Sequence, residues 1–183
     1  IRIYSTGGTF TAIRQLLGSE SPHLVQVSDY TGQPEMQGGL VKTLDFRIYL
    51  GLLSETYNAA HQADLARTGA VPFDLVVVNL YPFQQTVAAS GVTPEAARTN
   101  IDIGGPCMVR ASAKNYLRVA SVTDPADYPE VLDELRRRQG KLGLALRFRL
   151  MQKAFRHTAA YDAAISGFFS GVFTDFASAL VVL

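Results

Sequence analysis

The segment "DLVVVNLY", residues 74–81, indicates how this chain folds. It contains four consecutive aliphatic residues before the next polar side chain, Asn79. A strand without polar alternation is typical of a parallel sheet that is buried on both faces. Other apolar, β-branched segments lie on both sides of it, and we expect further strands at residues 2–4, 24–27 and 117–122.

Segments with helical spacing separate these strands. The first expected helix spans residues 9–17, with Ile13, Leu16 and Leu17 facing inward, and the second spans residues 54–68, capped by Ser54 and ended by Gly69. Three more are expected: one capped by Thr93 with Pro94 at its first position, one from Asp124 or Pro125 to Gly140, and one over residues 144–166. Strands that alternate with helices predict an α/β fold with a parallel sheet.

The composition is that of an ordinary globular chain of 183 residues, 48% of them apolar and 18% charged. This length suits one domain. The formal net charge of +1 points to neither nucleic acid nor a membrane surface as a partner. Cys107 is the single cysteine, which excludes an intrachain disulfide and fits a reducing, cytoplasmic compartment. The three histidines are scattered without metal-ligand spacing, so we expect no metal site.

A first candidate site is "STGGT", residues 5–9, between the first expected strand and a helix. Glycines let an anion approach the backbone, and the N–H groups at a helix N-terminus can bind phosphate. A tight turn with a threonine cap would explain the same residues. Lys42 and Thr43 lie at the end of a long Gly- and Pro-rich loop, residues 29–43, and Tyr81 follows the buried strand. Taken alone, Lys42 could be a solvated lysine and Tyr81 a cap on the core.

The stretch "NIDIGGPCMVRASAKN", residues 100–115, is the stronger candidate. We expect Pro106 at the first helical position, after a bare Gly-Gly backbone that a ligand could approach. Asp102 could accept a proton there or simply cap the helix. Lys114 would then lie about 12 Å along the helix axis from Pro106, where it also favours the helix dipole. A nucleotide-sized ligand along the helix could meet both Asp102 and Lys114.

The order of these motifs, together with "VSDYTGQPEMQGGLVKTL", "VTDPADYPEVL" and "KAFRHTAAYDAAI", resembles the inosine monophosphate (IMP) cyclohydrolase domain across nearly the whole chain. In that family the domain is the N-terminal half of a bifunctional purine biosynthesis protein whose other half is a formyltransferase. The resemblance implies the methylglyoxal synthase-like (MGS-like) three-layer α/β fold, here with a helical extension at about residues 144–183. It also implies closure of the 5-formamidoimidazole-4-carboxamide ribonucleotide ring to IMP, without cofactor or metal, in a homodimer.

The resemblance assigns roles to individual positions. Catalytic roles fall on Lys42, Tyr81, Asp102 and Lys114. Substrate-binding roles fall on Thr6, Gly7, Gly8, Thr9 and Thr43 around the phosphate, on Asn79, and on Ile103, Gly104 and Gly105 around the base. Ring closure requires an acceptor at a weakly nucleophilic amide N–H, which Asp102 can supply, and a cation at the developing oxyanion, which either lysine can supply.

Some positions depart from the family pattern. Leu40 replaces an arginine, and Asp45, Phe46 and Tyr49 replace His, Pro and His. The family's first strand and its formyltransferase half are absent from the given residues, which we expect to form a single domain. Two alternatives therefore remain open: a non-catalytic nucleotide- or phosphate-binding module, and a methylglyoxal synthase-like lyase.

Overall fold

The computed structural model describes residues 1–18, 21–34, 36 and 41–176. Its strands form two parallel pairs. Strand β1 (Ile3–Ser5) pairs with β2 (Leu24–Gln26), with Tyr4 opposite Val25. Strand β3 (Leu75–Val77) pairs with β4 (Ala120–Val122), with Val76 opposite Ser121. The expected parallel pairing is confirmed, but within the described residues the strands form two pairs rather than one continuous sheet.

In the described residues before β3, four helices accompany β1 and β2. They are α1 (Gly7–Leu17), α2 (Val27–Thr31), α3 (Phe46–Leu53) and α4 (Ala59–Thr68). The expectation that Leu16 and Leu17 face inward is wrong, because their exposures are 86% and 48%. Helical spacing reveals an apolar face but not whether another element covers it.

The expected helix 54–68 is also corrected. Ser54 ends α3, and its N–H donates to the carbonyl of Leu50. The next helix is capped by Asn58, whose side chain accepts from the N–H groups of Ala60 and His61. The side chain of Asn58 can satisfy two N–H groups that have no partner within the helix, which explains the later start. Gly69 ends α4 in the left-handed region, as expected.

Three helices connect β3 to β4. They are α5 (Phe83–Val87), α6 (Pro94–Thr99) and α7 (Gly104–Lys114). Helix α6 has the expected cap, since the Thr93 hydroxyl accepts from the N–H of Ala96 at 3.1 Å. Helix α7 begins at Gly104, so Pro106 occupies its third position rather than its first. The Gly-Gly pair is therefore part of the helix and presents its first N–H groups.

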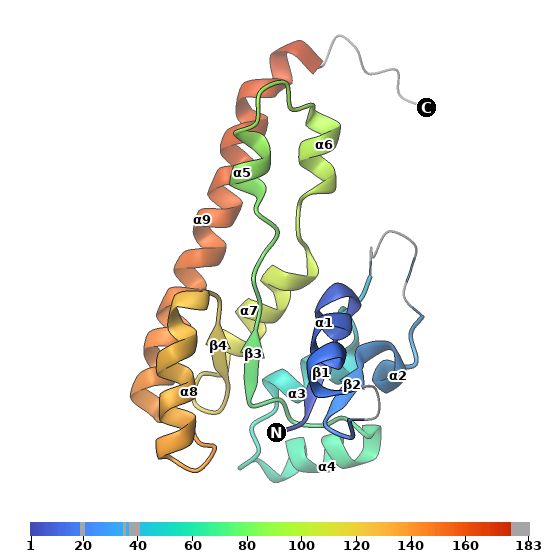
Figure 1. The fold of residues 1–183 in the computed structure, drawn as a ribbon, viewed down its shortest axis with the longest axis vertical. Coiled ribbons are helices and arrows are strands. Elements are labelled where there is room, and N and C mark those ends of the chain that lie inside the picture. Colours follow the sequence, from blue (N-terminus) through green and yellow to red (C-terminus); the bar gives the residue numbers. More distant parts are fainter. Residues whose placement is uncertain (19–20, 35, 37–40, 177–183) are drawn as a thin grey trace.

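The remainder of the chain is mainly helical. A short 3-10 turn, η2 (Pro125–Asp127), capped by Asp124, leads into α8 (Tyr128–Arg137). The expected helix thus begins near Pro125, but as a 3-10 turn, and its α-helical part ends three residues before Gly140. Helix α9 (Leu144–Phe176) is longer than the expected 144–166. It runs along one whole side of the molecule, with α5 against its upper half and β4 and α7 near its lower half (Figure 1). No described helix combines the length and apolar character needed to span a bilayer.

The core is divided among several apolar clusters. Val76 and Val119 pack with residues of α3, while Ala120 and Val122 pack with α8 and the start of α9. A third cluster joins Phe83 to Tyr161, whose rings meet edge to face at 6.2 Å. Helix α9 therefore belongs to the core of the fold along much of its length.

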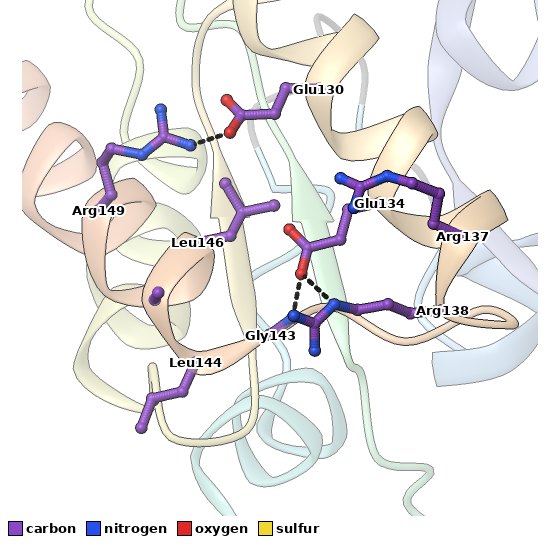
Figure 2. Close-up of a pocket in the computed structure, with 9 residues that line it drawn as sticks. Glu130, Glu134, Arg137, Arg138, Gly143, Leu144, Leu146 and Arg149 are labelled. Atoms are coloured by element: carbon purple, nitrogen blue, oxygen red, sulfur yellow. Dashed lines mark hydrogen bonds and ion pairs between the residues drawn. The ribbon is translucent and has the colours of Figure 1, made fainter.

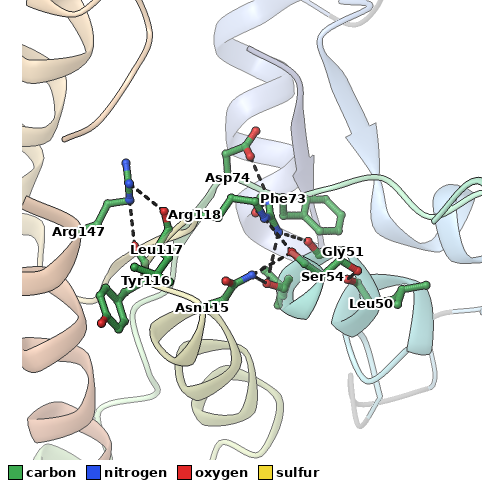
Figure 3. Close-up of polar contacts among 11 residues, drawn as sticks. Leu50, Gly51, Ser54, Phe73, Asp74, Asn115, Tyr116, Leu117, Arg118 and Arg147 are labelled. Atoms are coloured by element: carbon green, nitrogen blue, oxygen red, sulfur yellow. Dashed lines mark hydrogen bonds and ion pairs between the residues drawn. The ribbon is translucent and has the colours of Figure 1, made fainter. Parts of the chain in front are cut away.

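A polar clamp fixes α3 against the end of α7 (Figure 3). The guanidinium of Arg118, whose side chain is 9% exposed, donates to several acceptors on neighbouring elements. These acceptors are the carbonyls of Gly51, Leu52, Ser54 and Phe73 and the carboxylate of Asp74. The Asn115 amide adds bonds to the carbonyls of Leu52 and Ser54 at 2.8 and 3.1 Å. The clamp satisfies carbonyls at the C-terminus of α3 that have no partner within the helix.

Candidate functional site

The turn after β1 has the features of a phosphate loop. Thr6 precedes α1 with extended backbone angles, and its side chain makes no capping hydrogen bond. Gly7 has φ +52°, in the left-handed region that favours glycine. The carbonyl of Thr6 accepts from Phe10, so the N–H groups of Gly7, Gly8 and Thr9 are the ones that the first helical turn leaves available. These groups can bind an anion.

Lys42 lies against this turn. A β-carbon placed on Gly7 would be 3.3 Å from the Lys42 ammonium nitrogen. The chain thus brings a cation to the helix N-terminus that sequence reasoning assigned to the phosphate, although 35 residues separate the two in sequence. The positive charge and the N–H groups would act on the same anion.

Thr43, which follows Lys42 in the chain, lies against the start of α7. A β-carbon on Gly104 would lie 2.9 Å from the Thr43 hydroxyl oxygen, closer than an ordinary contact. The absence of a side chain at Gly104 therefore lets the two segments approach each other. It also places the predicted phosphate residues beside those predicted around the base.

Two of the departures from the family pattern in this region, Asp45 and Tyr49, have structural roles. Asp45 is buried and caps α3, since its carboxylate accepts from the N–H of Arg47 at 2.8 Å. Phe46 is 62% exposed, whereas Tyr49 packs against the core around Val76. Burial, and then the neighbouring Cys107, raise the pKa of Tyr49. Leu40 lies outside the described residues.

Asp102 is held at the N-terminus of α7 by a local hydrogen bond. Its Oδ1 accepts from the N–H of Gly105 at 2.9 Å. A β-carbon on Gly105 would lie 2.5 Å from Asp102 Oδ2 and 2.7 Å from Leu80 Cδ2. The carboxylate thus caps the helix, and both it and Leu80, in the segment after β3, lie beside Gly105. The cap uses one oxygen, and the carboxylate has acceptor capacity beyond it.

Tyr81 and Ile103 are exposed residues on the two segments that meet beside Gly105. Tyr81 directly follows Leu80 and is 50% exposed, and Ile103 is 59% exposed. Both are therefore accessible to a molecule that reaches Asp102 from solvent.

Sequence reasoning missed Tyr161 of α9. Its hydroxyl accepts from the backbone N–H of Asp102 at 2.8 Å and donates to the carbonyl of Asn100 at 3.3 Å. Burial is the main cause that raises the Tyr161 pKa, and the nearby Asp102 and Tyr81 add to it. Tyr161 lies within the "KAFRHTAAYDAAI" segment, but the spacing of that segment predicts only a buried helical face.

For two of the predicted site residues, Asn79 and Lys114, the structure shows no contact with Lys42, Thr43 or Asp102 among the described residues. Asn79 instead donates from its side-chain amide to the hydroxyl of Tyr128 at 3.0 Å. Lys114 is exposed at the last position of α7, about 15 Å along the helix axis from Gly104. Arg147 fixes the chain just beyond it through the carbonyls of Tyr116 and Leu117 (Figure 3).

Two shallow cavities lie elsewhere on the molecule. One, of about 350 Å³, is bordered by α8 and the start of α9 (Figure 2). Four of its charged side chains already pair with one another, Glu130 with Arg149 and Glu134 with Arg138, and Arg137 pairs with Asp133. The other, of about 450 Å³, lies between Thr123 and His157. Most of the predicted site residues lie not in these cavities but in three segments that approach one another: the turn at residues 6–9, Lys42 and Thr43, and the start of α7 with Asp102.

Comparison with known proteins gives the class to which this arrangement belongs. The model of the MGS-like domain matches residues 1–107, more than half of the chain, and the chain therefore belongs to the MGS-like domain family. Residues 112–181 match the model of the AICARFT/IMPCHase bienzyme. The first match contains the turn at residues 6–9, Lys42, Thr43 and the start of α7, and the second contains Lys114 and all of α9. The predicted family relationship and fold are thereby confirmed.

The particular relatives are proteins called bifunctional purine biosynthesis protein PurH. Those of Magnetococcus marinus and Sorangium cellulosum are 48% and 50% identical over 172 residues, which cover 94% of this chain and 32% of each relative. This chain thus spans about a third of the length of these relatives. Among solved structures, the crystal structure of ForH matches with a TM-score of 0.80 and 32% identity, over 92% of this chain and 84% of that chain.

Proposed function

We propose that this chain is an IMP cyclohydrolase, which closes the 5-formamidoimidazole-4-carboxamide ribonucleotide ring with loss of water. The observation that carries the proposal is the convergence of three loops. The Lys42 ammonium lies against Gly7, the Thr43 hydroxyl against Gly104, and the Asp102 carboxylate on Gly105. The names of the PurH relatives and the bienzyme match support the same pathway.

Within this proposal the phosphate binds to the turn at residues 6–9, beside Lys42 and Thr43. The base then lies on the exposed backbone of residues 103–105. This orientation brings the carboxamide nitrogen to Asp102, which accepts its proton as the nitrogen attacks the formyl carbon. Tyr81 is accessible at the same edge and can donate to the oxygen that leaves as water.

Lys42 is the cation that the geometry favours for the developing negative charge or for the phosphate. Lys114 requires a ligand, or a neighbouring chain, that extends along α7, because the helix itself separates it from Asp102. We propose that its role depends on such an extended arrangement. We also propose that the chain acts in the cytoplasm as a homodimer, together with a formyltransferase that is either fused to it or separate.

The test is an absorbance assay of ring closure with the synthetic formamido ribonucleotide and without added metal, folate or nucleoside triphosphate. We expect turnover by the folded protein, and its loss by roughly 100-fold or more in Lys42→Met. Lys141→Met, a substitution of another lysine in an exposed turn, is the matched control and retains activity.

Two outcomes would contradict the proposal in different ways. Binding of IMP with no turnover would support the nucleotide-binding module. Phosphate release and methylglyoxal formation from dihydroxyacetone phosphate would support the lyase.

A further inference from the structure

The Tyr161 hydroxyl is the point at which α9 reaches the turn that carries Asp102. Tyr161 is 8% exposed, and its hydroxyl both accepts from the Asp102 N–H and donates to the Asn100 carbonyl. Its single proton is therefore directed at Asn100. The hydroxyl cannot donate that proton to a substrate at the same time, so its role differs from that of an acid.

The ring of Tyr161 is itself fixed by packing. It meets the buried Phe83 edge to face at 6.2 Å, and the same cluster includes Leu80 and Ile101. Ile101 directly precedes Asp102, and Leu80 lies close to Gly105, where a β-carbon would be 2.7 Å from Leu80 Cδ2. The hydroxyl is thus held at a fixed place from which it bridges the backbone on both sides of Ile101.

This contact joins the two parts of the chain that match different family models. Asp102 lies in the part matched by the MGS-like domain, and Tyr161 lies in the part matched by the bienzyme. The MGS-like part therefore does not hold its own Asp102 turn alone. Helix α9 supplies a hydrogen bond that the turn needs, since an N–H without a partner is costly.

We propose that Tyr161 is a positioning residue for the cyclohydrolase reaction, which fixes the backbone of the Asp102 turn and through it the carboxylate. This proposal rests on the proposed function. A displacement of a reacting group by about 1 Å can lower a rate on the order of 100-fold. Removal of the hydroxyl alone, in Tyr161→Phe, should therefore lower kcat by about 10-fold to 100-fold. KM should change by less than about threefold, because the phosphate loop is not touched.

The matched control is Tyr30→Phe. The Tyr30 hydroxyl also accepts from a backbone N–H, that of Val71 at 2.9 Å, and its ring also lies in an aromatic cluster. Its partner Val71 precedes β3 at the N-terminal end of that strand, whereas Leu80, which lies beside Gly105 and the Asp102 turn, follows the C-terminal end. Tyr30→Phe should lose stability to a comparable extent and keep its kcat.

The experiment combines a double-mutant cycle with amide hydrogen exchange. If Tyr161 acts through Asp102, Tyr161→Phe should cost kcat much less in the Asp102→Asn background than in the wild type. A peptide covering residues 100–105 should exchange at least 10-fold faster in Tyr161→Phe but not in Tyr30→Phe. Unchanged exchange in that peptide, or equal losses in both backgrounds, would overturn the proposal. If the wild type shows no turnover, the proposed function fails, and the exchange result still decides whether Tyr161 holds the turn.

Discussion

A methyl group added at Gly105 provides the sharpest test of how the site is built. In Gly105→Ala the new β-carbon would lie 2.5 Å from Asp102 Oδ2 and 2.7 Å from Leu80 Cδ2. The first distance is about 0.9 Å shorter than the 3.4 Å at which ordinary van der Waals contact begins. The carboxylate must therefore move by nearly 1 Å, or the start of α7 must shift away from it.

The effect on stability is the difference between two opposing contributions. Overpacking of a tight site costs about 1–3 kcal/mol. Alanine is about 1 kcal/mol better than glycine inside a helix. The net loss in the free energy of unfolding should therefore be about 0–2 kcal/mol, small enough for the variant to fold. The displacement of a reacting carboxylate by nearly 1 Å should lower kcat on the order of 100-fold.

The assay is single-turnover ring closure, with urea denaturation of the same preparation. Gly167→Ala is the matched control, because a β-carbon there meets nothing within 4 Å and the residue lies in α9. It should keep full activity and gain up to about 1 kcal/mol in stability. Wild-type kcat in Gly105→Ala would show that the Asp102 carboxylate is not held at the place where the reaction requires it.

Further variants test the base, the clamp and an ion pair. Asp102→Asn should lower kcat roughly 100-fold or more, with a much smaller change in IMP affinity as measured by titration. An unchanged kcat would show that Asp102 serves as a helix cap and not as the base. Arg118→Met should lower the free energy of unfolding, measured by urea denaturation, by about 2–4 kcal/mol, because buried carbonyls lose their donors. Arg137→Met breaks only an exposed ion pair and should lower it by less than about 0.5 kcal/mol. The hydrogen bond from Lys153 is the main cause that lowers the pKa of Asp124. The pair therefore stabilises the fold at pH values above the ordinary carboxyl pKa of about 4, and this stabilisation is lost as the pH falls below that value. Lys153→Met should therefore be less stable than the wild type at pH 6, with a difference that narrows in acid; a constant difference would refute the assignment.

Local signals in the sequence predicted the elements that are governed by local chemistry. The Thr93 cap, the helix start near Pro125 and the end of α4 at Gly69 follow from short-range hydrogen bonds and backbone preferences. The start of α7 was misplaced by two residues, because proline is tolerated throughout the first helical turn, where N–H groups have no partner in the helix. The exposure of Leu16 could not be predicted, since it depends on which elements cover α1.

The arrangement of the candidate site residues could be predicted only in part, for a similar reason. Motif order selected Lys42, Thr43 and Asp102 as candidates, and the fold brings their loops together. Tyr161 was missed because its contact with Asp102 joins residues 59 positions apart, and nothing in the spacing of α9 distinguishes it from other buried aromatic residues. The separation between Asp102 and Lys114 follows from the length of α7. Whether one ligand meets both residues depends on the shape of that ligand, which the sequence does not contain.

The most direct test of the central claim is a crystal structure with bound IMP. We predict that the phosphate lies within hydrogen-bond distance of the N–H groups at residues 7–9 and of Lys42, with the base against residues 103–105 and beside Asp102. IMP bound away from these three loops, for instance in the cavity near Arg138 and Arg149, would contradict the claim that they form one nucleotide site.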